Sequence, residues 1–549
     1  MAGTYDYIIV GAGSAGCVLA NRLSADGANR VLLLEAGGSD RRFWVQVPIG
    51  YGKTYYQRAV NWMYMTEDVP GLGDRPSYWP RGKVLGGSSS INAMVYIRGH
   101  ARDYDDWAAA GNPGWSYADV LPYFIRLETH PTGAGPYHGG LGPLRVSDVS
   151  GDAHPLCQCF LDAGEQAGLA RNPDFNGAAQ DGVGLYQLTV DKGLRMSAAR
   201  AFLRPAMKRP NLTVRTRAHV ARVLLEDATA TGVDYVCGGR RHSALAAREV
   251  ILCGGAVNSP QLLQLSGIGP RDVLEPLGIT VVRDSPAVGR NLQDHLGVDY
   301  LFQCNRKTLN DDLNPWWGKL RAGLRYAFTR RGPLSLSINQ AGGFFKTDPS
   351  LPQPDMQLYF SPVSYTRAPP NTRPLMNPDP FSAFLLGVSN CRPSSRGYVR
   401  IRSSDPCAAP EIQPGYLSTD ADARALLAGV RFIRTLAGMP AFKDIITREL
   451  RPGEDCRGDE RLLQDIRENA WSVFHACSTC RMGPDPRSDV VDHRLRVHGV
   501  RRLRVADASV FPFLISGNTN AAAMMVGEKA ADLILGDAAR PPSVPDTGS

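Results

Sequence analysis

The chain of 549 residues is 43% hydrophobic and 21% charged, as expected of a soluble globular protein that is too long for one compact core. Its formal net charge is +8, but lysine and arginine are scattered, which argues against a nucleic-acid-binding surface. No apolar run is long enough to predict a membrane-spanning helix.

The N-terminal residues predict a parallel α/β unit. Residues 7–10 form a short apolar run typical of a buried strand, residues 15–23 have the pattern of a helix, and residues 31–34 predict a second strand. This order is typical of an α/β domain with a parallel sheet. Because the first strand starts near Tyr5, no room is left for a secretory signal, and we expect a cytoplasmic protein.

A glycine-rich turn joins the first strand to the first helix. Gly11, Gly13 and Gly16 match the G-x-G-x-x-G pattern, in which the glycines allow a tight turn and a close approach to pyrophosphate. The pyrophosphate then lies at the helix N-terminus, where free N–H groups favour negative charge. Glu35 ends the second strand, where a carboxylate accepts hydrogen bonds from ribose hydroxyls. The turn predicts a bound dinucleotide but does not distinguish NAD from FAD.

The middle of the chain adds an ordered loop and further strands. Residues 78–100 are turn-rich, with paired glycines, and predict a loop that enters a helix, whereas residues 131–143 are rich in Gly and Pro and predict a crossing between domains. Residues 211–223 and 249–253 predict strands, and residues 254–265 predict a helix.

The C-terminal half differs in composition and in the kind of strand that it predicts. Residues 304–405 contain many prolines and strands that we expect to be antiparallel, as at residues 396–401. Residues 501–507 predict a return to a strand, and residues 521–535 predict a final helix.

The eleven cysteines are scattered and odd in number, which argues against a disulfide framework. Cys477 and Cys480 form a CxxC pair, and Cys157 and Cys159 form a CxC pair, but neither has a second pair at zinc spacing. We therefore expect reduced cysteines that pack as small apolar residues, and no metal site.

Further motifs lie along the chain: RGKVLGGSSSIN at residues 81–92, GGAVNSPQLL at 254–263, SGIGP at 266–270, GRNLQDH at 289–295, VADAS at 505–509 and GNTNAA at 517–522. As a set, they resemble the glucose–methanol–choline (GMC) oxidoreductases, which are FAD-dependent. The resemblance covers residues 5–535 in the family's order. Within the family it is nearest to choline dehydrogenases and sorbose dehydrogenase-like alcohol dehydrogenases.

The resemblance implies a mixed α/β fold of two domains. One is a Rossmann-like FAD-binding domain with a parallel sheet, and the other is a substrate-binding domain built on an antiparallel sheet with helices. We assign residues 1–150, 196–300 and 470–536 to the FAD-binding domain and residues 151–195 and 301–469 to the substrate-binding domain. Residues 537–549 are rich in Pro and Ser and are expected to form a disordered tail.

The resemblance also assigns residues to the cofactor. Ile91 stands where some relatives carry a histidine that is joined covalently to the flavin, so we expect non-covalent FAD. The residues expected to contact FAD are Gly11, Gly13, Ser14, Ala15, Gly16, Glu35, Ala36, Arg81, Val84, Gly86, Gly87, Ser88, Asn92, Met94, Val95, Val220, Ala506, Asp507, Asn518 and Thr519.

Removing a hydride from an alcohol carbon requires a base for the hydroxyl proton, and histidine often serves this purpose near neutral pH. The resemblance places His475 at the position of the family's catalytic histidine. It places Asn520 across the substrate oxygen, and Val473 and Phe474 in the wall of the substrate cavity.

Other aromatic residues and histidines have weaker support. Trp316, Trp317 and Tyr359 are candidate cavity walls, although aromatic residues in a second domain are more often core. His295 follows a glycine-rich turn and is expected to pack beneath the flavin domain. The remaining histidines, including His493 and His498, are not expected to act as bases.

We therefore predict FAD-dependent oxidation of an alcohol (a CH–OH donor) to an aldehyde or ketone. Hydride passes to flavin N5, and the electrons then pass to a quinone or dye-like acceptor. Two alternatives stay open: an oxidase that reduces O₂ to hydrogen peroxide, and an FAD-containing hydroxynitrile lyase that uses the same histidine. The sequence does not indicate which alcohol is used (choline, sugar, polyol, aliphatic or polyether), whether a membrane is contacted peripherally, or the oligomeric state.

Overall fold

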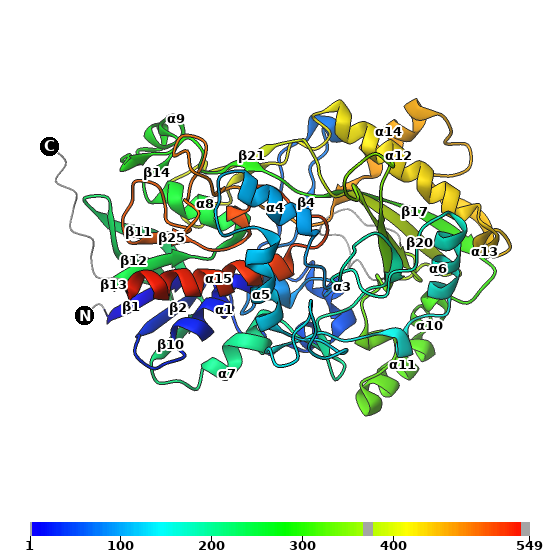
Figure 1. The fold of residues 1–549 in the computed structure, drawn as a ribbon, viewed down its shortest axis with the longest axis horizontal. Helices are drawn as coiled ribbons and strands as arrows, with labels where there is room; N and C mark the ends of the chain where they lie inside the picture. Colours follow the sequence, from blue (N-terminus) through cyan, green and yellow to red (C-terminus); the bar gives the residue numbers. More distant parts are fainter. Residues whose placement is uncertain (1–2, 366–376, 540–549) are drawn as a thin grey trace.

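The computed structural model describes residues 3–365 and 377–539. Two large sheets organise this part of the chain (Figure 1). One lies near the two chain ends and the other lies at the opposite end of the molecule. This arrangement confirms the expected class, a mixed α/β fold with one mainly parallel sheet and one antiparallel sheet.

The first sheet has a parallel centre and an antiparallel flank. β1 (Gly3–Val10) and β2 (Val31–Glu35) are neighbours, and the inner half of β1 and all of β2 are buried. Such continuous apolar strands are typical of parallel sheets that are covered on both faces. The remaining strands are β10 (Leu212–Thr216), β13 (Arg240–Leu252) and β25 (Leu503–Val505), which pair in parallel, and β11 (Ala218–Glu226) and β12 (Thr229–Cys237), which pair antiparallel.

Helices bring distant parts of the chain to this sheet. α1 (Ser14–Leu23) follows β1 directly and packs beside α15 (Asn520–Ala538), so helices from opposite ends of the described chain lie side by side (Figure 1). α8 (Gly255–Leu265) follows β13. The carboxyl ends of β1 and β13 therefore each lead into a helix N-terminus.

The second sheet is antiparallel throughout. Its central strands, β17 (Leu296–Cys304) and β20 (Ala383–Asn390), are almost wholly buried, and α12 (Asp420–Ala437) packs on β20. The other strands are β7 (Gly182–Leu185), β18 (Ala341–Phe345), β19 (Met356–Ser361), β23 (Ile446–Arg451) and β24 (Trp471–Ser472).

Several element boundaries differ from the sequence predictions. The strand expected at residues 211–223 is two strands, β10 and β11, because Arg217 between them has a left-handed backbone (φ 55°). The strand expected at residues 396–401 is β21 (Gly397–Arg400), which lies in a separate three-stranded sheet with β16 (Arg290–Leu292) and β22 (Glu411–Gln413).

The structure bears on two further expectations, the disordered C-terminal tail and the domain boundary at residue 300. The prediction that disorder begins at residue 537 is wrong, because Asp537 lies in α15 and accepts a hydrogen bond from Arg504 (2.8 Å); residues 540–549 lie outside the described residues. The division into domains stays a prediction, but the boundary at residue 300 falls inside β17, and β24 pairs with β17.

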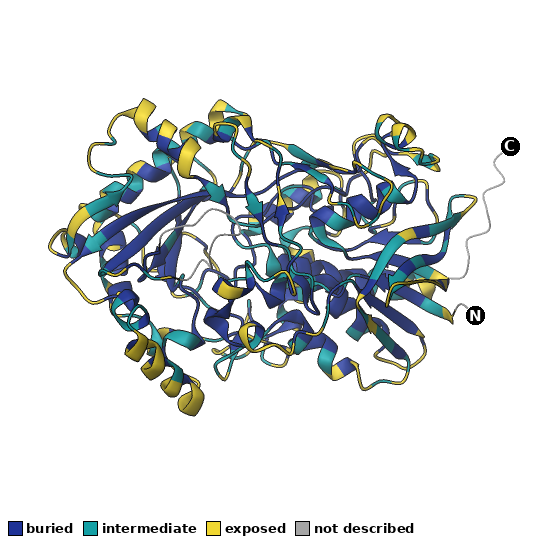
Figure 2. Cartoon of the chain, turned by 180° about the vertical axis from the view of Figure 1, so that it is seen from behind, coloured by how far each residue is buried: buried dark blue, intermediate teal, exposed yellow. Residues whose placement is uncertain are grey.

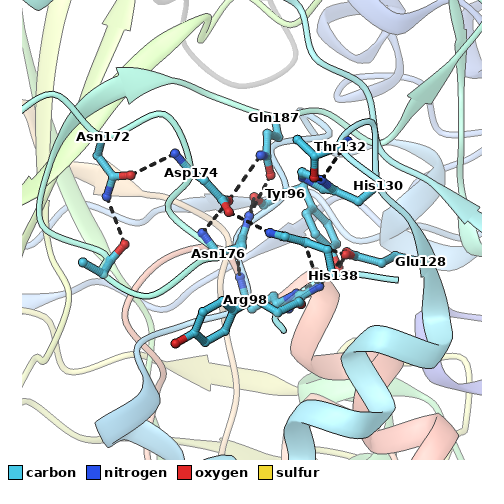
Figure 3. A network of polar contacts seen from close by, with 12 residues as sticks. Tyr96, Arg98, Glu128, His130, Thr132, His138, Asn172, Asp174, Asn176 and Gln187 are labelled. Carbon is cyan, nitrogen blue, oxygen red and sulfur yellow. Dashed lines mark hydrogen bonds and ion pairs between the residues drawn. The ribbon is translucent and has the colours of Figure 1, made fainter. Parts of the chain in front are cut away.

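A mostly buried polar network joins several loops that are far apart in the sequence (Figure 3). Glu128 accepts hydrogen bonds from the Tyr96 hydroxyl (2.6 Å) and pairs with Arg98 (2.6 Å). His138 bridges Glu128 and Asp174, with 2.7 Å between each ring nitrogen and its carboxylate oxygen. Burial alone would lower the pKa of His138, but the hydrogen bonds to Asp174 and Glu128 raise it to about 9.

His138 is therefore an imidazolium at neutral pH, between two carboxylates. Its stabilising contribution is complete below the ordinary histidine pKa of 6.5 and is lost as the pH rises through about 9. One potential metal-ligating atom each of His130, His138 and Asp174 lies within 4.8 Å of the others. Because both nitrogens of His138 already bond to carboxylates, we assign the network to ion pairing.

Candidate active site

The glycine-rich turn is shaped by close backbone approach. Gly11 has a left-handed backbone (φ 103°), and a side chain there would overlap the carbonyl group of Cys253 at the end of β13. A side chain at Gly16 would overlap the carbonyl oxygen of Gly11. The N-cap of α1 is Gly13, and no side chain among the described residues caps this helix, so its first N–H groups can bind a ligand. These are the conditions that the sequence motif predicts.

Glu35 lies at the end of β2, beside this turn. Its two oxygens accept hydrogen bonds from the backbone N–H groups of Ala12 (2.9 Å) and Gly37 (2.7 Å). Burial raises the pKa of Glu35 to about 7, although the two hydrogen bonds lower it. The carboxyl group lines a cavity that continues past the turn towards the second sheet.

The segment with paired glycines, residues 81–92, packs against the glycine-rich turn at residues 11–16. A side chain at Gly87 would meet Cα of Gly13 at 2.7 Å, so the two loops touch backbone to backbone. Arg81 also lines the cavity, and its Nε and Nη2 atoms are buried without a hydrogen-bond partner among the described residues. Buried guanidinium N–H groups require acceptors. The cavity therefore fits a ligand that brings oxygen acceptors to a glycine cradle.

The cavity gathers most residues that the sequence assigned to the cofactor. Gly16, Val84, Gly86 and Ala506 are the exceptions and support the lining from behind, since Gly86 donates to the Ala12 carbonyl (2.7 Å) and Ala506 to that of Leu252 (2.8 Å). That the residues bind FAD stays a prediction. The assigned residues in the lining are Gly11, Gly13, Ser14, Ala15, Glu35, Ala36, Arg81, Gly87, Ser88, Asn92, Met94, Val95, Val220, Asp507, Asn518 and Thr519.

Asp507 fixes the second helix N-terminus at the cavity. One of its carboxylate oxygens accepts hydrogen bonds from the Gly255 backbone (2.8 Å) and from the Ser259 hydroxyl (2.6 Å). Its other oxygen accepts from the Ser509 backbone (2.7 Å). Asp507 thus joins the end of β25 to the start of α8, and both parts of the chain line the cavity.

His475 reaches the far end of the cavity from a short segment after β24. Phe474 has a left-handed backbone (φ 67°), which turns the chain just before the histidine. The backbone N–H of His475 donates to Asp294 (2.6 Å), and that of Val473 donates to the His295 carbonyl (2.9 Å). The GRNLQDH motif at residues 289–295 therefore holds the histidine segment in place.

Three side chains form a hydrogen-bonded row through His475. His295 Nε2 lies 3.0 Å from the carbonyl oxygen of Cys391, and its Nδ1 lies 2.8 Å from Nδ1 of His475. On the other side, Nε2 of His475 lies 3.0 Å from the amide nitrogen of Asn518. His295 is fully buried, and His475 is 8% exposed.

The row determines which nitrogens carry protons. A carbonyl oxygen only accepts hydrogen bonds, so Nε2 of His295 must donate to Cys391. Burial lowers the pKa of His295 to about 4, which keeps it neutral at pH 7 and leaves Nδ1 as an acceptor. His475 must then donate from Nδ1. Its Nε2 then has a lone pair that accepts a hydrogen bond from the Asn518 amide at the edge of the cavity.

His475 is also held in the neutral state. Burial lowers its pKa well below the ordinary value of 6.5, and the neighbouring His295 and Arg81 lower it further. A neutral imidazole with a fixed tautomer and a lone pair directed into a cavity has the properties of a general base.

The expectation that Asn520 faces His475 is wrong. Asn520 is the first residue of α15, and its amide oxygen accepts a hydrogen bond from the Ser14 hydroxyl (2.8 Å) in the glycine-rich turn. Asn518, which the sequence assigned to the cofactor alone, contacts His475 instead. The two residues are only two positions apart, so the motif did not reveal which of them faces the histidine.

The walls near His475 are mostly aromatic and aliphatic. Val473, Phe474 and Tyr359 line the cavity as expected. The suggestion that Trp316 and Trp317 line it is wrong, because both lie on α11 (Trp316–Thr329) and are 76% and 53% exposed. Sequence reasoning missed other lining residues, namely Tyr55, Val298, Asp299, Tyr365, Leu385, Val388 and Trp471.

Comparison with known proteins agrees with this geometry. Family models described as GMC oxidoreductase match residues 5–297 and 393–527. Human mitochondrial choline dehydrogenase is 44% identical over 97% of this chain and 90% of its own length. An alcohol dehydrogenase (acceptor) from Pseudomonas putida is 43% identical over 97% and 96%. The solved structure of pyridoxine 4-oxidase from Mesorbium loti has a TM-score of 0.86 at 33% identity, covering 96% of this chain and 98% of the other.

Proposed function

Because the chain belongs to the GMC oxidoreductase family of FAD-dependent enzymes, we propose that it oxidises a neutral alcohol with His475 as base and Asn518 as the partner of the substrate oxygen. The expectation of an FAD-dependent, alcohol-oxidising enzyme is confirmed by the family matches and the full-length relatives. The observation that supports His475 as the base is its row of hydrogen bonds from Cys391 to Asn518.

FAD supplies the redox chemistry, since the bound flavin accepts the hydride that leaves the carbinol carbon. The chain's own contribution is to hold the cofactor by the glycine cradle, Glu35 and the unpaired N–H groups of Arg81. Ile91 is 2% exposed, lines the cavity and has no atom that can bond covalently to a flavin. We therefore propose non-covalent FAD.

The proton path follows from the fixed tautomer. The hydroxyl proton of the substrate moves to Nε2 of His475, while Nδ1 keeps its proton and its hydrogen bond to His295. The amide of Asn518 donates to Nε2 of His475 in this structure; once the substrate hydroxyl takes its place at Nε2, that N–H would donate to the substrate oxygen as negative charge develops there. Neither step requires His475 to rotate.

The charges around the cavity favour a neutral substrate over a cationic one. Recognition of a quaternary ammonium group such as that of choline needs both an aromatic cage and a carboxylate. The carboxylates among the described lining residues are already engaged: Glu35 and Asp507 accept backbone hydrogen bonds, and Asp299 pairs with Arg451 (3.3 Å). The aromatic and aliphatic walls near His475 suit an alcohol with an apolar or aromatic group. This favours an uncharged alcohol over choline, which is the substrate in the name of the human relative.

The mode of cofactor attachment can be tested on the purified holoenzyme. Acid precipitation should release all flavin into the supernatant, because Ile91 leaves no covalent link. Flavin content of the pellet and of the supernatant is measured by absorbance. Yellow colour that stays with the washed pellet would contradict non-covalent binding.

The substrate proposal is tested by anaerobic flavin reduction in a stopped-flow instrument. Neutral benzylic and medium-chain aliphatic alcohols should bleach the flavin, and choline should do so at least about tenfold more slowly, because its charge would be desolvated without an unengaged carboxylate nearby. Choline that reduces the flavin faster than every neutral alcohol would contradict the proposal. Admitting O₂ or a quinone afterwards shows which acceptor reoxidises the flavin.

The base and its orientation are tested by two histidine variants. His475→Gln should lower the flavin-reduction rate by roughly 10²–10⁴-fold, because the proton acceptor is lost. His295→Phe should lower it by about 10–10³-fold through loss of the fixed tautomer, with little change in KM or FAD content. The rate of the parent enzyme should be constant above pH 7 and fall in acid, since the pKa of His475 lies below 6.5.

A histidine with a similar bond but no place in the cavity serves as the control. His498 also bonds to a backbone carbonyl, that of Gly483 (2.9 Å), and His498→Phe should leave the rate unchanged. A His295→Phe enzyme with the parent rate and the parent pH profile would show that His295 has no positioning role.

Alanine variants of the two asparagines should lose different properties, the flavin-reduction rate for Asn518 and the FAD content for Asn520. Asn518→Ala should reduce the flavin about 10–10³-fold more slowly with normal FAD content, because one preorganised donor to the substrate oxygen is lost. Asn520→Ala should retain less FAD, because its bond to Ser14 joins α15 to the glycine-rich turn, and its rate per bound flavin should stay near that of the parent. The reverse pattern would restore Asn520 as the residue opposite His475.

A further inference from the structure

The outward face of α11 (Trp316–Thr329) is apolar, which is unusual for a surface helix. The helix projects from the lower right of the molecule in Figure 1, and it is largely exposed in Figure 2, where it lies at the lower left. Gly318, Ala322 and Tyr326 are its buried residues. The exposed large apolar side chains are Trp316 (76%), Trp317 (53%), Leu320 (54%), Leu324 (50%) and Phe328 (85%).

The positions of these residues place them on one face. Successive residues of a helix are about 100° apart, so Trp316, Leu320, Leu324 and Phe328 span an arc of about 120°. The buried residues at positions 318, 322 and 326 have their centre on the opposite side of the helix. Surface helices normally turn their apolar stripe towards the core. In α11 the small buried residues form a narrow contact with the body, and the broad apolar arc faces away from it.

Basic residues flank this arc, and residues 316–331 contain no acidic residue. Arg321 and Arg325 each have one carboxylate partner, Asp312 and Asp152 respectively. The other basic residues, Lys319, Arg330 and Arg331, are exposed and have no ion pair among the described residues. The surface therefore combines an apolar arc with unneutralised positive charge.

We propose that α11 docks on an anionic phospholipid bilayer, with its apolar arc among the headgroups and upper acyl chains. An apolar face bordered by Lys and Arg, with Trp at its edge, is the pattern of a helix that lies in the membrane interface. None of the helices in the described residues is long and apolar enough to cross a membrane. Contact is therefore peripheral.

The charge distribution decides between a bilayer and a second copy of the chain. In a symmetric dimer through this face, each basic flank would lie close to the flank of its partner, and the like charges would repel. An anionic bilayer provides an apolar acyl-chain region for the arc and negatively charged headgroups for the basic residues. The membrane is thus the occupant that satisfies both features of the surface.

The test is sedimentation of the holoenzyme with sucrose-loaded vesicles of phosphatidylcholine alone or of phosphatidylcholine with phosphatidylglycerol. Binding should be at least about tenfold stronger to the anionic vesicles and should weaken as salt is added. The variant Trp316→Gln, Leu320→Gln, Phe328→Gln should lose about tenfold or more of this binding, because it removes apolar side chains from the interface. Lys319→Gln, Arg330→Gln, Arg331→Gln should lose the preference for anionic lipid.

A matched control uses exposed apolar residues elsewhere, in the variant Leu141→Gln, Met207→Gln, Val282→Gln, which should bind vesicles like the parent. Flavin content and the rate of alcohol-dependent flavin reduction confirm that each variant is folded. Light scattering after size-exclusion chromatography measures its oligomeric state. Equal vesicle binding by the parent and the α11 variant would overturn the proposal. A dimer that the α11 substitutions convert to a monomer would also overturn it, in favour of a second copy.

Discussion

The carbonyl oxygen of Cys391 can accept a hydrogen bond but cannot donate one, and the protons of the proposed catalytic centre are arranged by this fact. It sets the tautomer of His295, which sets that of His475 and leaves Nε2 as a lone pair directed at the cavity. The sheet brings these groups together, since His295 precedes β17, Cys391 follows β20 and His475 follows β24, and β17 pairs with both other strands. A backbone carbonyl just after a strand of the antiparallel sheet thus sets the tautomer of the proposed base.

The cofactor cradle depends on the other sheet. Its turns follow β1 and β13 directly, and the start of α15 brings Asn518 and Asn520 to the same place from the end of the chain. Asn520 bonds to Ser14 in the glycine-rich turn, and Asn518 bonds to His475, the proposed base. Residues 518–520 therefore set the distance between the glycine-rich turn and the proposed base His475. Hydride transfer requires such a distance to be constant.

The sequence predicted the features that depend on local geometry. Gly11, Gly16 and Glu35 belong to one strand–turn–helix–strand unit, and spacing alone implies their roles. The contact between His295 and His475 joins residues 180 positions apart, so no local pattern could reveal it. The choice between Asn518 and Asn520 depends on where α15 begins, which sequence patterns place only to within a few residues. Trp316 and Trp317 were misplaced because aromatic residues are more often buried than exposed.

Glu35 links the cofactor to the acidity of its surroundings. Burial raises its pKa to about 7, so without a ligand close to half of these carboxyl groups carry a proton at neutral pH. The proposed FAD ribose, whose hydroxyl groups would donate to Glu35, would favour the ionised carboxylate, and binding would then release this proton to solvent. By thermodynamic linkage, we expect the affinity for FAD to fall as the medium becomes mildly acidic. Mildly acidic buffer is therefore the condition in which we expect the flavin to exchange most readily.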